Sequence, residues 1–100
     1  MLRHVVLFRW KPGTSAEKVR EIEDAFRALP GKIPLIAGFE WGREVSVQNL
    51  HQGFTHCFLV SFASEADRDA YATHPDHLEF IALCAPHREA ILVVDYFAGS

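Results

Sequence analysis

The strongest constraint on the fold comes from predicted strands that are apolar on both faces. In residues 3–10, apolar side chains alternate on the two sides of the backbone, with Val6 on one face and Leu7 on the other. Residues 54–62 follow the same period-two pattern, and residues 90–97 form a β-branched run that favours a buried strand. A sheet that contains such strands must be covered on both of its faces.

A helix is predicted after the first strand. Residues 14–17 read Thr-Ser-Ala-Glu, a capping box in which the Thr14 hydroxyl and the Glu17 carboxylate satisfy free amides at a helix start. The helix is expected to end at Pro30-Gly31 and to turn its charged residues, Glu23 among them, toward solvent. Its apolar stripe consists of Val19, Ile22, Phe26 and Leu29.

The second half of the chain contains further helical segments. Ser64 is a predicted N-cap, and His74-Pro75 interrupts the helix because a residue before proline is pushed out of helical geometry. Pro75 can begin a new helix. One stripe of that helix contains His77, Phe80, Ile81 and Cys84. A further strand is expected between Leu35 and Glu44.

The resulting order, β-α-β-β-α-β, is typical of α+β proteins with a ferredoxin-like fold, an antiparallel four-stranded sheet with helices on one face. A chain of 100 residues has room for one domain, here residues 1–100. Because the helices cover only one face, the other apolar face needs a partner. We therefore predict a homodimer in which two sheets pack face to face around a barrel-like apolar interior.

Composition argues against several other classes of protein. With 49% apolar and 23% charged residues, the chain has the balance of a globular protein. The net charge is −3 and no cluster of Lys and Arg is present, which argues against a nucleic-acid surface. No apolar run approaches the ~20 residues of a membrane span, and no signal-peptide pattern is present. We expect a cytoplasmic protein without membrane or nucleic-acid partners.

An RNA-recognition domain is the main alternative with the same element order. Gly53-Phe54 and the aromatic residues of 58–62 loosely match its third-strand signature. Gln52 stands where that signature has a basic residue, and the net negative charge also argues against this alternative.

The distribution of the six histidines suggests a site. His4 and His56 share strand faces with core residues, and His77 lies on an apolar helical stripe. With Tyr71, these three histidines could line one cavity between sheet and helices, where burial keeps imidazoles neutral and able to accept protons. The alternative is that each histidine is a hydrogen-bonded, inert core residue.

Metal and cofactor sites are not predicted. Cys57 and Cys84 lack ligand spacing and are interpreted as small core residues. In His74-Pro75-Asp76-His77 the proline interrupts the spacing that a helical metal site needs, and His74 is better explained as a cap ahead of Pro75. No phosphate-binding loop or dinucleotide fingerprint is present, so no cofactor is expected.

Several motifs together resemble those of the stress-responsive α/β-barrel domain (Dabb) family, nearly from end to end. They are His4-Val5-Val6-Leu7-Phe8, Phe39-Glu40-Trp41-Gly42, Asn49-Leu50-His51-Gln52-Gly53-Phe54-Thr55-His56, His74-Pro75-Asp76-His77 and Val93-Val94-Asp95-Tyr96. The resemblance implies a dimeric ferredoxin-like α+β barrel. Some plant members of the family are stress-induced proteins without an established reaction. Some bind a cation near the end of the first helix through backbone groups, a site that side-chain identity does not predict.

One branch of the family, which includes a plant polyketide cyclase, closes a ring by intramolecular aldol condensation without a metal or organic cofactor. The resemblance implies His77 as its general base and Tyr71 as the hydroxyl partner, with His4 and His56 in the pocket. This branch also has a tyrosine where the present chain has Phe26. The pocket, which would include Phe80, therefore lacks one hydroxyl group. This difference argues against the same substrate as that of the cyclase.

Two hypotheses follow. In the first, the protein is a homodimer that binds a small, mainly apolar molecule between sheet and helices, with cofactor-independent proton transfer of the cyclase or lyase type. In the second, it is a non-catalytic stress-response or interaction protein whose dimeric barrel is structural.

Overall fold

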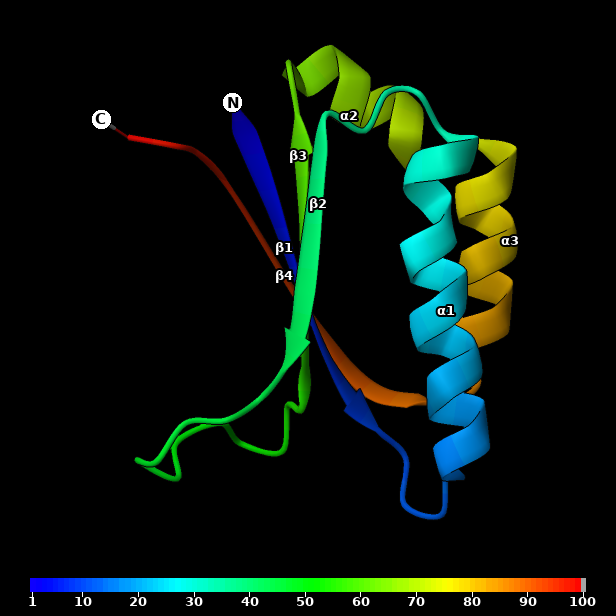
Figure 1. The fold of residues 1–100 in the computed structure, drawn as a ribbon, viewed down its shortest axis with the longest axis vertical. Coiled ribbons are helices and arrows are strands. Elements are labelled where there is room, and N and C mark those ends of the chain that lie inside the picture. Colours follow the sequence, from blue (N-terminus) through cyan, green and yellow to red (C-terminus); the bar gives the residue numbers. More distant parts are fainter. Residues whose placement is uncertain (100) are drawn as a thin grey trace.

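The computed structural model describes residues 1–99 and contains one four-stranded antiparallel sheet with the strand order β2-β3-β1-β4. The helices lie in a layer on one face of the sheet (Figure 1), which confirms the predicted α+β ferredoxin-like fold. No helix within residues 1–99 is long and apolar enough to cross a membrane. The elements are β1 Leu2–Trp10, α1 Ala16–Lys32, β2 Gly38–Arg43, β3 His56–Phe62, α2 Glu65–Ala72, α3 Pro75–Cys84 and β4 Arg88–Phe97.

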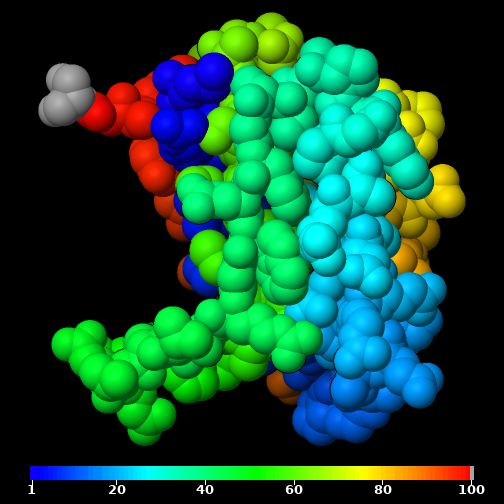
Figure 2. Space-filling view, in the orientation of Figure 1, coloured from blue at the N-terminus to red at the C-terminus, as the bar shows by residue number. Residues whose placement is uncertain are grey.

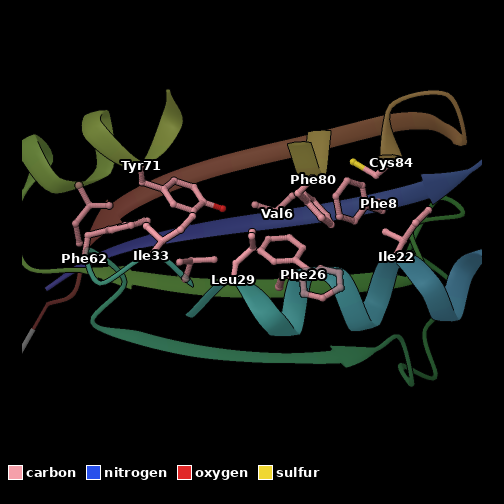
Figure 3. Packing of buried hydrophobic residues seen from close by; sticks show 13 residues of the cluster. Val6, Phe8, Ile22, Phe26, Leu29, Ile33, Phe62, Tyr71, Phe80 and Cys84 are labelled. Carbon is pink, nitrogen blue, oxygen red and sulfur yellow. The ribbon is translucent and has the colours of Figure 1, made fainter. Parts of the chain in front are cut away.

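The core lies between the sheet and the helices. The register pairs Val6 of β1 with Phe58 of β3, so that both side chains face the helical layer. Phe26 of α1 stacks on Phe58, with 4.2 Å between ring centroids, and contacts Phe80 of α3 at 4.6 Å. Figure 3 shows Phe26 and Phe80 inside this layer, next to Val6. The inward stripes predicted for both helices are therefore confirmed at these positions.

Helix α1 differs from its predicted form at both ends. Its N-cap is Ser15, whose hydroxyl accepts a hydrogen bond from the backbone amide of Lys18. The Thr14 hydroxyl instead donates to the carbonyl of Lys11 in the preceding turn. The helix also continues through Pro30 to Lys32. Proline removes one backbone donor, and the loss is tolerated here in the last turn of the helix.

Glu23 is buried, with 5% of its surface exposed, although the sequence pattern had placed it toward solvent. Its position explains the error. Glu23 lies four residues after Val19 and three before Phe26, and therefore on the same helical face as the apolar stripe. The charged side chain is tolerated because polar partners lie within hydrogen-bond distance of it.

Strand β4 is an edge strand and is not buried as its sequence predicted. Ile91 is 40% exposed and Val94 is 50% exposed. The helix-facing residues Ile91 and Val93 are 40% and 46% exposed, so the helices of residues 1–99 cover β4 only in part. A β-branched run can therefore indicate a strand without indicating that helices of the same chain cover it.

The second face of the sheet is not covered by described residues. It carries the apolar side chains Val5, Leu7, Leu59, Leu92 and Val94, together with the partly buried Cys57. Cys57 is therefore not a core residue in this chain, whereas Cys84 is buried in the core.

Residues 44–55 connect β2 to β3 and form an arm that stands out from the body of the molecule on the side of the uncovered sheet face (Figures 1 and 2). Its apolar side chains are strongly exposed, with Val47 at 95% and Leu50 at 71%. A groove of about 400 Å³ lies where the arm leaves the sheet, lined in part by Leu7 and Phe54.

Candidate active site

His77 and Tyr71 lie side by side between the sheet and the helices. Tyr71 belongs to α2 and His77 to the first turns of α3, and their ring centroids are 4.1 Å apart. His77 Nδ1 lies 3.0 Å from the carbonyl oxygen of Ala72. A carbonyl oxygen only accepts hydrogen bonds, so Nδ1 carries the proton and Nε2 keeps its lone pair in the neutral ring. Within residues 1–99, no group forms a hydrogen bond with Nε2.

The two side chains are held in complementary protonation states. Burial lowers the pKa of His77, and the neighbouring His4 and His74 lower it further against the opposing effect of the Ala72 carbonyl. Burial raises the pKa of Tyr71 well above its ordinary value. At neutral pH His77 is therefore a neutral base, and Tyr71 is a protonated hydroxyl that can donate a hydrogen bond.

The Tyr71 hydroxyl is buried and has no hydrogen-bond partner within residues 1–99. Figure 3 shows its oxygen directed along the sheet toward Val6 and Phe80. An unpaired buried hydroxyl costs about 1–3 kcal/mol in a folded protein. Such a group is therefore unusual in a core and marks a position where a ligand could supply the missing acceptor.

His4 approaches the same space from β1. Its Nδ1 lies 2.6 Å from a carboxylate oxygen of Asp95 on the neighbouring strand β4. The second oxygen of Asp95 accepts a hydrogen bond of 3.1 Å from Arg68 of α2. Because a carboxylate accepts, His4 Nδ1 is the donor, and this contact fixes the orientation of the ring. The His4 and Tyr71 rings are 6.1 Å apart.

These side chains surround a cavity of about 150 Å³ between sheet and helices. His4, Tyr71 and His77 line it together with the predicted pocket residues Phe26 and Phe80. Arg88 also lines it. The remaining lining is aliphatic or aromatic and consists of Val6, Phe8, Ile81, Ile91 and Val93.

His56 does not line this cavity, although the sequence had suggested that three histidines converge. It pairs with Phe8 in the sheet, four positions along β1 from His4. Its Nε2 donates to Glu23 at 2.6 Å, while Trp10 Nε1 and the Thr55 hydroxyl contact Nδ1 at 3.2 and 2.9 Å. Both ring nitrogens therefore have partners.

Arg43 completes the cluster around His56. It contacts the buried Glu23 carboxylate through Nε at 2.8 Å and Nη2 at 2.7 Å. Burial lowers the pKa of His56, and Glu23 opposes that effect. The cluster consequently consists of a neutral imidazole and an ion pair, with the imidazole hydrogen-bonded at both nitrogens.

The other histidines have structural roles or lie outside the cavity. His74 is the N-cap of α3, as predicted, and its Nδ1 accepts from the amide of Asp76. His51 Nδ1 accepts from the amide of Gly53 in the arm. Among the described residues, no group of three or more His, Cys, Asp or Glu side chains has an arrangement that could hold a metal ion.

The sequence pattern does not single out Asp95, Arg68 or Arg88, which the structure places at or beside the cavity. For Asp95 a signal existed, because it is the single charged residue in the apolar run 90–97. A lone carboxylate at such a position needs a partner, and the register supplies His4. Arg68 and Arg88 carried no comparable signal, since each stands among other polar residues.

The fold and the cavity define an α+β protein of ferredoxin-like fold with histidine and tyrosine side chains around an internal pocket. The model of the stress responsive A/B barrel domain family, Dabb, matches residues 2–98, and the chain belongs to this family. It is 38% identical over 95 residues to the stress-response A/B barrel domain-containing protein HS1 of Arabidopsis thaliana, covering 95% of this chain and 87% of that protein. Olivetolic acid cyclase of Cannabis sativa is 26% identical over 95 residues, covering 95% and 94% of the two chains.

Solved structures with the same fold include a hydroxynitrile lyase from Passiflora edulis. It superimposes with a TM-score of 0.92 at 29% identity, covering 98% of this chain and 93% of that one. A dimeric ferredoxin-like protein of unknown function from Thermobifida fusca gives a TM-score of 0.82 at 25% identity, covering 95% and 88%. The family thus includes relatives named as enzymes as well as proteins named for stress response.

Proposed function

We propose that the protein binds a small, mainly apolar carbonyl compound or hydroxynitrile in the cavity and catalyses proton transfer on it without a cofactor. One observation carries the proposal. His77 has its Nδ1 proton committed to Ala72, which leaves Nε2 as a base, and the ring of Tyr71, whose hydroxyl is unpaired, lies 4.1 Å from the His77 ring. The relatives named as a cyclase and a hydroxynitrile lyase support this class of chemistry.

For a carbonyl substrate, His77 Nε2 removes a proton from the carbon next to the carbonyl group. The electron pair of that C–H bond moves toward the carbonyl oxygen and forms an enolate. Tyr71 donates a hydrogen bond to this oxygen, where negative charge develops. The proton is returned from His77 when the product forms, so the protein ends in its starting state.

The size and lining of the cavity limit the substrate. A cavity of roughly 150 Å³ lined by apolar side chains is large enough for a benzene ring. The site therefore accepts one aromatic ring or a short branched chain, and a larger molecule extends past the partly exposed Ile91 and Val93 of β4.

The test is hydrogen–deuterium exchange at the α-carbon of phenylacetaldehyde in D₂O, followed by NMR. The compound combines one ring with an acidic C–H group. We expect the wild-type protein to accelerate exchange and His77→Asn to lower this rate by about 10²–10⁴-fold, the usual contribution of a general base. Cleavage of the aromatic hydroxynitrile mandelonitrile, followed by benzaldehyde absorbance, provides a second assay.

His87→Gln is the matched control, because His87 lies in the turn after α3 and does not line the cavity. This variant should retain the wild-type rates in both assays. If the wild-type protein accelerates neither reaction, or if His77→Asn is as active as the control, the proposal is wrong. In that case the hypothesis of a non-catalytic stress-response protein is favoured.

We also propose that the protein is a homodimer, a state supported by the dimeric relative. The uncovered sheet face carries Leu92 and Val94, at 45% and 50% exposure, and the arm adds further apolar side chains on the same side (Figure 2). Two copies with their sheets face to face bury these surfaces in an isologous interface, with each arm against the partner.

Sedimentation velocity at micromolar concentration tests the dimer. We expect a dimer for the wild-type chain and a monomer for Val94→Glu, which places a charge in the apolar interface. Leu78→Glu is the control, because Leu78 is also 50% exposed but belongs to the helical layer. A monomeric wild-type chain, or a dimeric Val94→Glu variant, would contradict this arrangement.

A further inference from the structure

Arg88 is a charged residue in the wall of an otherwise uncharged cavity. It is the first residue of β4 and is partly buried. The register of β1 and β4 separates His4 from Arg88 along the sheet, because His4 of β1 pairs with Asp95 of β4, whereas Arg88 of β4 pairs with Trp10 at the far end of β1. The cavity thus has the histidines and tyrosine at one end, an apolar middle and a guanidinium at the other end.

A β-bulge turns Arg88 toward this cavity. The β1–β4 register runs regularly until Arg9 pairs with Ala90, and then it shifts so that Trp10 pairs with Arg88. Without the shift, alternation would place Arg88 on the same face as Ala90, away from the helices. Bulges redirect side chains in this way and are enriched beside active sites.

The guanidinium has no acidic partner in the described part of the chain. No carboxylate of residues 1–99 lies within ion-pair distance of Arg88, whereas the adjacent Glu89 pairs with Arg9 at 3.4 Å. No acidic side chain lines the cavity. Burial raises the pKa of the Cys84 thiol more than the charge and hydrogen bond of Arg88 lower it, so this neighbouring thiol stays neutral and supplies no negative charge. A partly buried cation without an internal counterion is suited to bind an anion.

We propose that Arg88 is a binding residue for a carboxylate, so that the preferred ligands are small aromatic or branched acids with an oxygen group at the opposite end. The carboxylate pairs with Arg88, the apolar body fills the middle of the cavity, and the oxygen group lies against Tyr71 and His77. The inference rests on the proposed function because it assigns the substrate class of the same cavity.

The experiment compares the binding of 4-hydroxybenzoate and 4-hydroxybenzamide by NMR titration. The two probes share a ring and a hydroxyl group and differ in charge. We expect the wild-type protein to bind the acid about 10- to 100-fold more tightly than the amide, the range for one charge-assisted hydrogen-bonded contact. In Arg88→Gln this preference should disappear while amide binding persists. Arg27→Gln, an exposed arginine of α1, should retain the preference.

The outcomes separate this inference from the proposed function. If the wild-type protein binds the amide as tightly as the acid, Arg88 is not a carboxylate site, whereas the cavity and its proton-transfer chemistry stand. The same conclusion follows if Arg88→Gln retains the preference for the acid. If neither probe binds, the carboxylate site and the proposed cavity ligand are both wrong. The wild-type comparison needs no substitution, so it decides even if Arg88→Gln does not fold.

Discussion

The chain contains two polar clusters beside one aromatic core, and they differ in how fully they are hydrogen-bonded. Around His56, both ring nitrogens have partners, and Glu23 is bound by an imidazole and a guanidinium. Around His77, one ring nitrogen and the Tyr71 hydroxyl have no partner among the described residues. The comparison teaches that burial of a histidine does not by itself indicate a ligand site. A buried group with an unused hydrogen-bonding position is the better indicator.

The largest expected effect is on the stability of the saturated cluster. His56→Ala should lower the free energy of unfolding by about 3–5 kcal/mol, because it creates a cavity and leaves the partly buried Trp10 N–H and the buried Glu23 with fewer partners. His77→Ala should lower it by only about 1 kcal/mol, since the half-buried ring has a single hydrogen bond. Urea denaturation measures both values. Equal losses would show that the two clusters do not differ in the way described.

A smaller effect of opposite sign is expected at Tyr71. Tyr71→Phe removes a buried hydroxyl without a partner and should raise the free energy of unfolding by about 1–2 kcal/mol. The rate of α-proton exchange in phenylacetaldehyde should also be lower with this variant than with the wild-type protein. Tyr96→Phe is the control, because Tyr96 does not line the cavity and is 47% exposed in the single chain. Its effect should stay within about 0.5 kcal/mol. A destabilised Tyr71→Phe variant would mean that the hydroxyl has a partner in solution.

The smallest effect is a pH dependence of stability to which both clusters contribute. Burial lowers the pKa of His56 and of His77 in the folded state, so the unfolded chain takes up protons first as the pH falls. The stabilisation that the two neutral imidazoles contribute is fully present above about pH 6.5, the pKa of histidine in the unfolded chain. It is lost as the pH falls below that value toward the folded pKa.

Urea denaturation between pH 8 and 5 measures this dependence. His56→Gln and His77→Gln should each make it shallower, and His87→Gln should leave it unchanged. If neither of the first two variants alters the slope, these imidazoles are not held neutral by the fold.

The sequence predicted the element order well because strand and helix periodicities are local signals. The sequence was a weaker guide to the burial of individual residues, because burial depends on contacts with elements that are distant in the sequence. Glu23 is buried because Arg43 and His56 contact it, and β4 is partly exposed because the helices of residues 1–99 cover it only in part. Neither outcome can be derived from the residues of the segment alone.

The candidate site was predicted in the same uneven way. His77, Tyr71 and His4 could be grouped because each lies on an apolar face of a recognisable element. His56 could not be separated from them, since it also lies on an inward face and only the register shows that it meets Glu23 instead of the cavity. The orientation of Arg88 depends on a bulge that has no clear signature in the sequence.

The central claim is that His77 lines a ligand-binding cavity and keeps its Nε2 free for a ligand, whereas His56 is fully hydrogen-bonded. Long-range ¹H–¹⁵N spectra of the imidazoles, recorded at neutral pH with and without 4-hydroxybenzamide, test it directly. We predict the Nδ1–H tautomer for His77 and the Nε2–H tautomer for His56, with the probe shifting the His77 resonances and leaving those of His56 in place. An Nε2–H tautomer for His77, or a probe that shifts His56 as much as His77, would contradict the account.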